Sequence, residues 1–129
     1  MSTTQTATRT ATRTVEKPWG HELIWAVTDR YVGKILHIEA GQSLSLQYHV
    51  KKDETVMVLR GKMAFTHYHE GEEPTVTELG PLVPFHVTPG LRHRMTAIED
   101  TDVVEVSTTE LDDVVRLEDK YGRKGTSAP

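Results

Sequence analysis

The chain contains no cysteine. Disulfide bonds, thiolate nucleophiles and thiolate metal ligands are therefore excluded, and any metal site must use nitrogen and oxygen donors. A reducing compartment is consistent with this absence, so we expect a cytoplasmic protein. The chain also lacks an apolar run near the roughly 18 residues that a membrane-spanning helix needs, and it lacks the apolar core of a secretory signal.

An excess of basic residues is missing as well. The 129 residues include 15 lysines and arginines against 19 aspartates and glutamates, which gives a formal net charge of −4. A nucleic-acid-binding protein would usually present a basic face, so this balance argues against such a partner. The length fits one domain, which can bury a sufficient core without covalent cross-links. The bulk numbers thus indicate one globular domain that binds neither nucleic acid nor membrane.

The two ends of the chain are low in apolar residues. Residues 1–14 read MSTTQTATRTATRT, a low-complexity segment that we expect to be a disordered tail. We expect the folded domain to cover residues 15–123. Residues 124–129 are expected to form a frayed C-terminus.

Between these ends the sequence alternates apolar and polar residues in short runs that are separated by turn signals every 8–12 residues. This pattern predicts an all-β sandwich or barrel of eight to ten strands, and closure into a jelly roll would remove most exposed strand edges. One exception is residues 110–122, ELDDVVRLEDKYG, for which we expect one or two helical turns. The clearest strand predictions are residues 31–39, 43–49, 54–59, 63–68, 76–79, 83–87, 93–97 and 103–108.

Candidate metal ligands lie in two stretches. Residues 41–61 contain Gln47, His49 and Glu54, and His93 follows a Pro-Gly turn. Alternation along residues 43–49 places Gln47 and His49 on one face. If Glu54 begins the next antiparallel strand, it lies close enough to His49 to share one ion. Imidazole, carboxylate and amide donors suit Fe, Mn, Co, Ni or Zn as divalent ions, and the donor types do not choose among them.

The two stretches resemble the two motifs of the cupin superfamily. The first motif has Gly, a His-x-His pair, Glu and Gly, and the second has Pro-x-Gly-x-x-His. The sequence departs from these motifs at Gln47, where the first His is expected, and at Thr88, where Pro is expected. Residues 44–49, LSLQYH, are similar to the cupin domain of type II mannose-6-phosphate isomerases. The matching residues are Gly41, His49, Glu54, Gly61, Gly90 and His93.

Further similarity to these isomerases extends over residues 15–123. It includes the segments 17–20 (KPWG), 112–116 (DDVVR) and 119–123 (DKYGR). The resemblance implies a double-stranded β-helix, the jelly-roll cupin barrel. It also implies that Gln47, His49, Glu54 and His93 bind a divalent metal ion, with Gln47 either a direct ligand or the holder of a metal-bound water.

The resemblance implies an enzyme, a metal-dependent isomerase of a sugar or sugar phosphate that works through a metal-chelated enediolate. The proton would be moved by His86, by Lys51 or by a metal-bound hydroxide. Alternatives are an Fe(II)-dependent dioxygenase, a metal-assisted lyase or decarboxylase of a small acid, and a sugar-binding protein without catalysis. In each case the partner is a small molecule, polar or anionic.

Two surface expectations complete the predictions. Lys51 and Lys52 could capture an anionic substrate, but the preferred interpretation is that they lie in a solvated turn. His67 and His69 adjoin an acidic loop, and we expect both at the surface. Apolar residues on both faces of the strand at residues 54–59 indicate that its sheet is also covered outside, so we expect a homodimer through that sheet.

Overall fold

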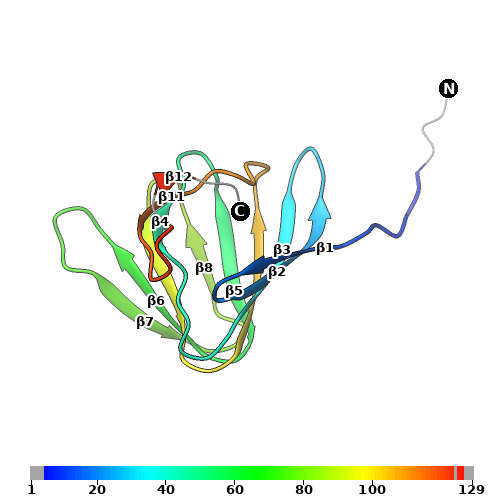
Figure 1. Cartoon of the computed structure of the whole chain (residues 1–129). Coiled ribbons are helices and arrows are strands. Elements are labelled where there is room, and N and C mark those ends of the chain that lie inside the picture. Colours follow the sequence, from blue (N-terminus) through cyan, green and yellow to red (C-terminus); the bar gives the residue numbers. More distant parts are fainter. Residues whose placement is uncertain (1–4, 124, 127–129) are drawn as a thin grey trace.

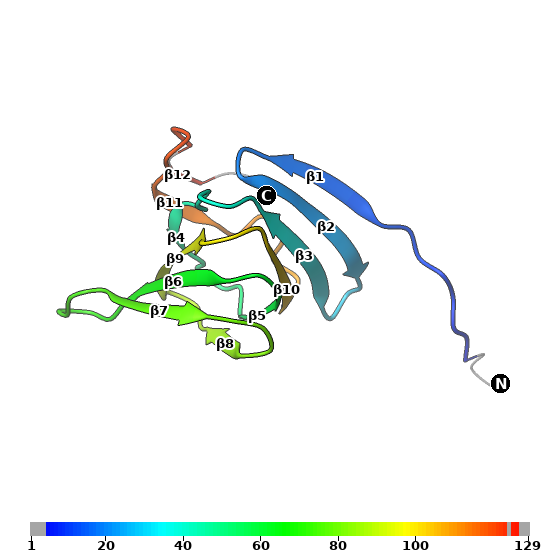
Figure 2. The same ribbon diagram turned by 90° about the horizontal axis from the view of Figure 1, so that it is seen from below.

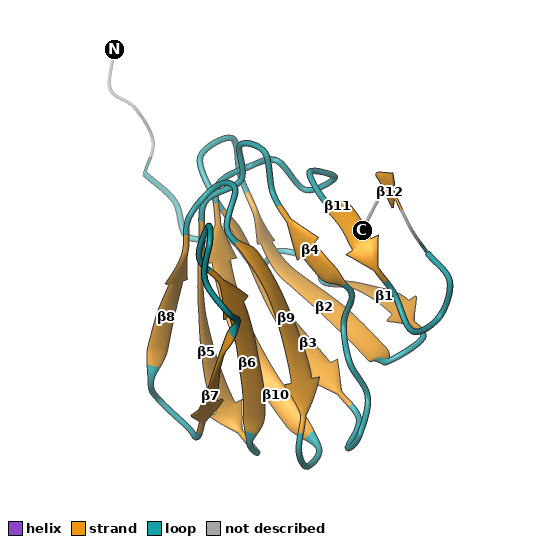
Figure 3. Ribbon diagram, turned by 90° about the vertical axis from the view of Figure 1, so that its left-hand side faces the viewer, coloured by secondary structure: helices purple, strands orange, loops and turns teal. Residues whose placement is uncertain are grey.

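The computed structural model describes residues 5–123 and 125–126, which form twelve β-strands and no helix (Figure 3). The strands belong to two six-stranded sheets that face each other (Figure 1). In spatial order, the first sheet contains β1 (Arg13–Lys17), β2 (Gly20–Val27), β3 (Val32–Ile38), β10 (Thr101–Ser107), β5 (Glu54–Arg60) and β8 (Pro84–Val87). The second contains β12 (Gly125–Thr126), β11 (Val115–Glu118), β4 (Leu46–Tyr48), β9 (Arg92–Ala97), β6 (Met63–Tyr68) and β7 (Thr75–Leu79).

All strand pairs are antiparallel, and neighbours in space are often distant in sequence. Strand β10 lies between β3 and β5, and β9 lies between β4 and β6. This connectivity confirms the predicted all-β jelly roll. Within the described part of the chain, no helix is long and apolar enough to cross a membrane.

The interior has an apolar half that the alternating strands build. On β5, Val56 and Val58 are buried while the residues between and after them are not, so these two side chains point inward. Burial of such a side chain contributes about 1.5–3 kcal/mol. The core cluster consists of Trp19, Leu36, Ile38, Leu44, Val56, Val58, Met63, Phe65, Leu79, Val87, Met95, Ala97 and Val103.

The C-terminal segment differs from the prediction. The helical turns expected within residues 110–122 are absent, and β11 occupies Val115–Glu118 instead. The physical reason is pairing with a distant strand, because Val115 lies opposite Tyr48 and Arg116 opposite Gln47 on β4. These backbone hydrogen bonds outweigh the local helical preference.

The N-terminal boundary also shifts. Strand β1 begins at Arg13, two residues before the expected start of the domain, because it pairs with β2 from Arg13 to Lys17. Residues 5–12 extend away from the barrel (Figure 1). Trp19, which follows β1, is buried in the core. Residues 1–4, 124 and 127–129 of the expected tail and C-terminus lie outside the described residues.

Strands β4 and β5 belong to opposite sheets, although the sequence indicated that they were neighbours. The strict alternation expected over residues 43–49 is interrupted, because the strand covers Leu46–Tyr48 and Leu44 is a buried core residue. Met57 and Leu59 on β5 therefore do not share a face with the apolar residues of β4.

Gly61 and Gly90 are two of the turn glycines whose backbone conformations L-residues rarely adopt. Gly61 has φ of 99°, and a Cβ there would lie 2.3 Å from the carbonyl oxygen of Asp100. Gly90 has φ of 86°, and its N–H donates to the carbonyl of His49 at 2.7 Å. The second glycine thus ties the turn before β9 to the end of β4.

Candidate metal centre and its cavity

Three predicted ligands meet inside the barrel. His49 follows β4, Glu54 begins β5 and His93 lies on β9. Their candidate ligand atoms all lie within 4.8 Å of one another. His49 Nε2 is 2.6 Å from Glu54 Oε1, and His93 Nε2 is 4.0 Å from the same oxygen. The turn at residues 50–53 carries the chain across the barrel, so His49 and Glu54 approach each other from opposite sheets.

Backbone carbonyls orient both imidazole rings. His49 Nδ1 lies 2.6 Å from the carbonyl oxygen of Asp113, and His93 Nδ1 lies 2.9 Å from that of Leu91. A carbonyl accepts only, so each Nδ1 carries the proton and donates it. The neutral ring then presents a bare Nε2 to the cluster, which is the form that binds metal.

The cluster has polar atoms that lack hydrogen-bond partners. Among the described residues, His49 Nε2, Glu54 Oε2 and His93 Nε2 are buried without one. Leaving buried acceptors unpaired is costly, and a shared cation would satisfy all three. The donor set of two imidazoles and one carboxylate fits a divalent transition metal. The residues present therefore fit the metal site that the sequence predicted.

Gln47 lies beside these ligands. It is paired with His93 across β4 and β9, so both side chains project from the same face of the sheet. Its Oε1 accepts a hydrogen bond from Ser45 Oγ at 2.7 Å. One lone pair of that oxygen is thus used by the protein. Both roles predicted for Gln47, direct ligand or holder of a metal-bound water, stay predictions.

A buried lysine and a second glutamate adjoin the ligands. Lys52 Nζ lies 3.0 Å from Glu105 Oε2 and 3.9 Å from Glu54 Oε2. Burial lowers the pKa of Lys52, but Glu105 and Glu54 outweigh burial and raise it. Burial raises the pKa of Glu54, but its neighbours, Lys52 foremost, outweigh burial and lower the pKa below its usual range. Burial and the neighbouring charge of Glu54 raise the pKa of Glu105 to about 7.

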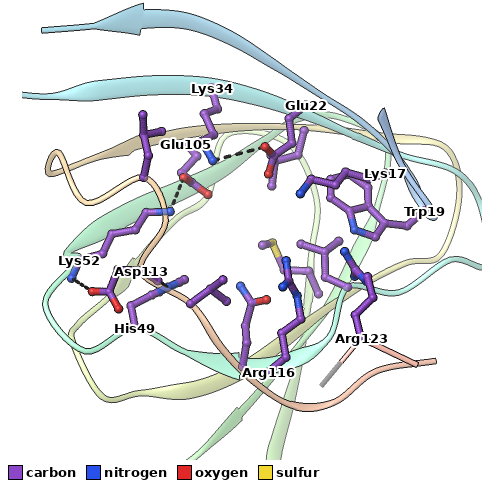
Figure 4. Close-up of a pocket in the computed structure, with 16 residues that line it drawn as sticks. Lys17, Trp19, Glu22, Lys34, His49, Lys52, Glu105, Asp113, Arg116 and Arg123 are labelled. Carbon is purple, nitrogen blue, oxygen red and sulfur yellow. Dashed lines mark hydrogen bonds and ion pairs between the residues drawn. The ribbon is translucent and has the colours of Figure 1, made fainter. Parts of the chain in front are cut away.

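A cavity of about 40 Å³ opens beside this cluster. His49 reaches it from the metal side, Glu105 from β10 of the first sheet, and Lys52 from the turn between β4 and β5 (Figure 4). Trp19, Leu36 and the other apolar side chains supply part of its wall. The lining residues are Lys17, Trp19, Glu22, Lys34, Leu36, Leu44, Gln47, His49, Lys52, Met95, Glu105, Leu111, Asp113, Val114, Arg116 and Arg123.

The two residues predicted to move a proton lie outside this cavity. His86 lies opposite Thr55 on the outer face of the first sheet, is exposed, and pairs with Asp53 at 2.6 Å. The side chain of Lys51 is exposed, and its backbone N–H donates to Asp113. Neither residue is brought to the metal cluster.

Two other expectations are wrong. Lys52 is not in a solvated turn, because its ammonium is buried between two glutamates. His67 is not a surface residue, because it is buried next to Phe85 and lies opposite His93 on the neighbouring strand. His69 is exposed as expected, and its Nε2 lies 3.2 Å from His67 Nδ1. Burial lowers the pKa of His67, and His69 adds to this effect.

The sequence interpretation missed a set of charged side chains that point inward. Glu22, Lys34 and Glu105 alternate with buried apolar residues on β2, β3 and β10. Lys34 Nζ lies 3.4 Å from Glu22 Oε2. The signal that could have identified them is a charged residue two positions from a core residue in the same strand, because such residues point to the same face. An example is Glu105, which follows the buried Val103 in the segment 103–107 (VVEVS).

Comparison with solved structures shows the same architecture elsewhere. Oxalate decarboxylase of Bacillus subtilis superposes with a TM-score of 0.76 at 15% identity, over 91% of this chain and 33% of that chain. The capsular polysaccharide assembling protein CapF from Staphylococcus aureus gives 0.65 at 19% identity, over 87% and 32%. KdgF from a Halomonas species gives 0.62 at 22% identity, over 78% and 88%. At these identities the likeness concerns the fold.

Sequence comparison gives the closer relationship. The mannose-1-phosphate guanylyltransferase ManC of Salmonella typhimurium strain LT2 is 33% identical over 119 residues. The match covers 86% of this chain and 23% of that protein, so the chain spans about a quarter of its relative. The family model described as mannose-6-phosphate isomerase C-terminal matches residues 4–119. The chain therefore belongs to the mannose-6-phosphate isomerase C-terminal family, within the cupin superfamily.

Proposed function

We propose that the protein is a metal-dependent isomerase that interconverts an aldose and a ketose, free or phosphorylated. The observation that carries this proposal is the convergence of His49, Glu54 and His93 beside a cavity, each with a buried polar atom that has no hydrogen-bond partner among the described residues. The family description supports a sugar phosphate as substrate. So does ManC, whose name specifies a mannose phosphate.

The metal site contributes polarisation. A divalent cation held by His49, Glu54 and His93 would act as a Lewis acid toward a substrate carbonyl and the hydroxyl next to it. The chain supplies the fixed orientation, because the carbonyls of Asp113 and Leu91 hold both rings with Nε2 free. Gln47 and Ser45 place an amide and a hydroxyl at the edge of the same site.

Isomerisation also needs a group that moves a proton. A proton leaves the carbon next to the carbonyl and returns to the former carbonyl carbon, while a second proton moves between the two oxygens. Glu105 is in position to carry the first of these, since its carboxylate lines the cavity next to the metal cluster. Lys52 holds that carboxylate at 3.0 Å. Proton transfer by a positioned group typically contributes 10²–10⁴-fold to the rate.

The proposal is tested with the purified full chain, its metal content and a panel of free and phosphorylated aldoses. We expect one of these sugars to be converted to its ketose, with deuterium from heavy water incorporated at carbon and the rate restored by one divalent metal after chelation. Glu105→Gln should retain the metal and lose at least about a hundredfold in turnover. Metal-loaded protein that converts none of the sugars would overturn the proposal.

The alternative reaction classes give different results. Activity toward a small acid that stops without oxygen would indicate a dioxygenase. Activity toward such an acid that continues without oxygen would indicate a lyase or decarboxylase. Saturable sugar binding without deuterium exchange would indicate a binding protein.

A further inference from the structure

Three cationic side chains converge on the end of the cavity away from Glu105. Lys17 ends β1, Arg116 lies on β11, and Arg123 follows β11 in the C-terminal segment. Figure 4 shows all three pointing into the cavity from one side, next to Trp19. They come from segments about a hundred residues apart, so their convergence is a product of the fold.

Within the described part of the chain, two of these cations have no carboxylate partner of their own. Arg123 forms a fork with Asp119, at 3.0 Å and 3.1 Å. For Lys17 and Arg116, by contrast, no ion-pair partner lies within 4.0 Å among the residues that the structure describes. The nearby Glu22 is already paired with Lys34.

Arg116 is the central member of the group. Its side chain is 7% exposed, and within the described residues its Nε is buried without a hydrogen-bond partner. Burial, and then the charge of Arg123, lower the pKa of the Arg116 guanidinium. Burial lowers the pKa of Lys17 too, with Glu22 opposing and Arg116 and Arg123 adding to the effect. Buried cations that repel one another are costly unless an anion lies between them.

The sheet fixes the distance between this group and the metal site. Arg116 lies opposite Gln47, and Gln47 lies opposite His93, in one row across β11, β4 and β9. Residues paired in this way project from the same face. Two strand spacings separate Arg116 from His93, or roughly 10 Å. A sugar-sized molecule with an anionic group at one end can span that distance.

We propose that Lys17, Arg116 and Arg123 form an oxyanion-binding subsite that holds the terminal phosphate or carboxylate of the ligand while its other end reaches the metal site. The part of this proposal that concerns the ligand's other end rests on the proposed function. Anion binding at the three cations does not.

The chemistry of the subsite favours a phosphate. A guanidinium presents a planar pair of donors that matches two oxygens of a phosphate or carboxylate, and a lysine adds a point charge. Arg123 is paired with Asp119, so Lys17 and Arg116 are the two cations without a carboxylate partner among the described residues. Two such cations in a shielded cavity are better neutralised by a dianion than by a monoanion. The subsite should therefore bind phosphate more tightly than acetate.

The test is calorimetric titration of inorganic phosphate and of acetate into the full chain, at constant ionic strength and without metal. We expect saturable phosphate binding that weakens by about tenfold or more in Arg116→Gln and in Lys17→Gln. Arg60→Gln is the matched control, since this exposed arginine pairs with Asp102 outside the cavity. Lys17 is partly exposed at the end of a strand, so its variant tests the subsite even if Arg116→Gln does not fold.

Equal phosphate affinity in Lys17→Gln, Arg60→Gln and the unaltered chain would overturn the subsite, as would the absence of saturable binding. Tighter binding of acetate than of phosphate would overturn the preference for a phosphate group. The readout needs no turnover. If the protein binds phosphate through Lys17 but has no isomerase activity, the subsite is supported and the proposed function fails. If it is an isomerase whose phosphate affinity does not depend on Lys17, the proposed function is supported and the subsite fails.

Discussion

The charge of Glu54 is the residue-scale feature on which metal binding depends most. It is the one carboxylate in the cluster of three candidate ligands, and the neighbouring charge of Lys52 lowers its pKa and favours its ionised form. Glu54→Gln keeps the shape and removes the charge, so we expect the affinity for a divalent metal to fall by at least about tenfold. Competition with a chromogenic chelator measures this affinity.

Glu78→Gln is the matched control for that change. Glu78 is exposed on β7 and pairs with Lys62, and neither residue belongs to the cluster of candidate ligands. Its variant should bind metal as the unaltered chain does. If Glu54→Gln binds as tightly as Glu78→Gln, the cluster is not the metal site.

The adjacent residues Lys51 and Lys52 differ in how much their side chains contribute to stability. Lys52→Met leaves Glu105 and Glu54 buried together without their shared cation, whereas Lys51 contributes only its backbone N–H to Asp113. Removing one partner of a buried ion pair costs roughly 3–5 kcal/mol. We expect urea unfolding of the metal-free protein to show a loss on that order for Lys52→Met, with little change for Lys51→Met. Equal stability of the two variants would contradict the buried network.

At this scale the sequence carries information about the ligands and much less about the charges around them. His49, Glu54 and His93 could be identified because donor type and spacing fit one ion. Lys51 and Lys52 could not be told apart, because alternation does not continue through a turn. The cationic group was missed because Arg116 was expected on a helix and no local pattern links it to the N-terminal strand.

The turn between β4 and β5 is the element that joins the two halves of the metal site. Asp113 from the C-terminal segment accepts hydrogen bonds from the backbone N–H groups of Val50, Lys51 and Lys52, at 2.9, 2.6 and 2.8 Å. Its own carbonyl orients His49. The C-terminal segment thus fixes both the turn and a ligand.

Asp113→Asn tests this element through pH. Burial alone would raise the pKa of Asp113, but the three N–H donors outweigh it and lower the pKa. Because the pKa of Asp113 is lower in the folded protein than in the unfolded chain, the carboxylate stabilises the fold at pH values above its unfolded pKa of about 3.9. This contribution disappears as the pH falls through the pKa of the folded protein. We expect Asp113→Asn to be less stable by roughly 1 kcal/mol at pH 7, with the difference closing below about pH 4.

Urea unfolding at several pH values measures the difference, and Asp112→Asn is the control. Asp112 is the exposed neighbour of Asp113. A stability gap for Asp113→Asn that stays constant down to pH 3 would show that the charge of this carboxylate does not hold the turn.

At the scale of elements, strands could be predicted and their partners could not. Alternation identified the strand at Met63–Tyr68 to the residue and the one at Glu54–Arg60 to within one residue. Sheet membership failed, because β4 and β5 follow each other in sequence and lie in opposite sheets. Pairing depends on segments far away in the chain, such as β11 against β4, and local propensity does not contain that information.

The whole barrel divides into an apolar half and a charged half. Figure 2 shows the hairpin of β6 and β7 at one side and β1 to β3 at the other. Phe65, Met63 and their neighbours fill the apolar half. His49 from the metal cluster, the Lys52–Glu105 pair and the cationic group line the cavity. Burying charged groups is unfavourable and lowers the stability of the fold. The burial of apolar side chains in the other half offsets this loss.

The outer face of the first sheet has exposed apolar side chains through which two copies of the chain could associate. Val106 on β10 is 50% exposed. It lies opposite Gly33 on β3 and Thr55 on β5, so these three residues lie side by side on the outer face of the sheet. The ring of Trp25 covers Gly33 and is itself partly exposed. Adjacent apolar groups of this kind are typical of contact surfaces. We therefore expect a homodimer through the outer face of the first sheet.

Val106→Glu would place a charge in this contact without touching the core, so the dimer should dissociate while the fold persists. Light scattering during gel filtration at micromolar concentration measures the mass, and circular dichroism checks the fold. Val76→Glu is the control, because Val76 is similarly exposed on β7 at the edge of the other sheet. A monomeric unaltered chain would contradict the dimer. A dimer that survives Val106→Glu would place the contact elsewhere, since a buried unpaired carboxylate at its centre would cost several kcal/mol, about a thousandfold in affinity.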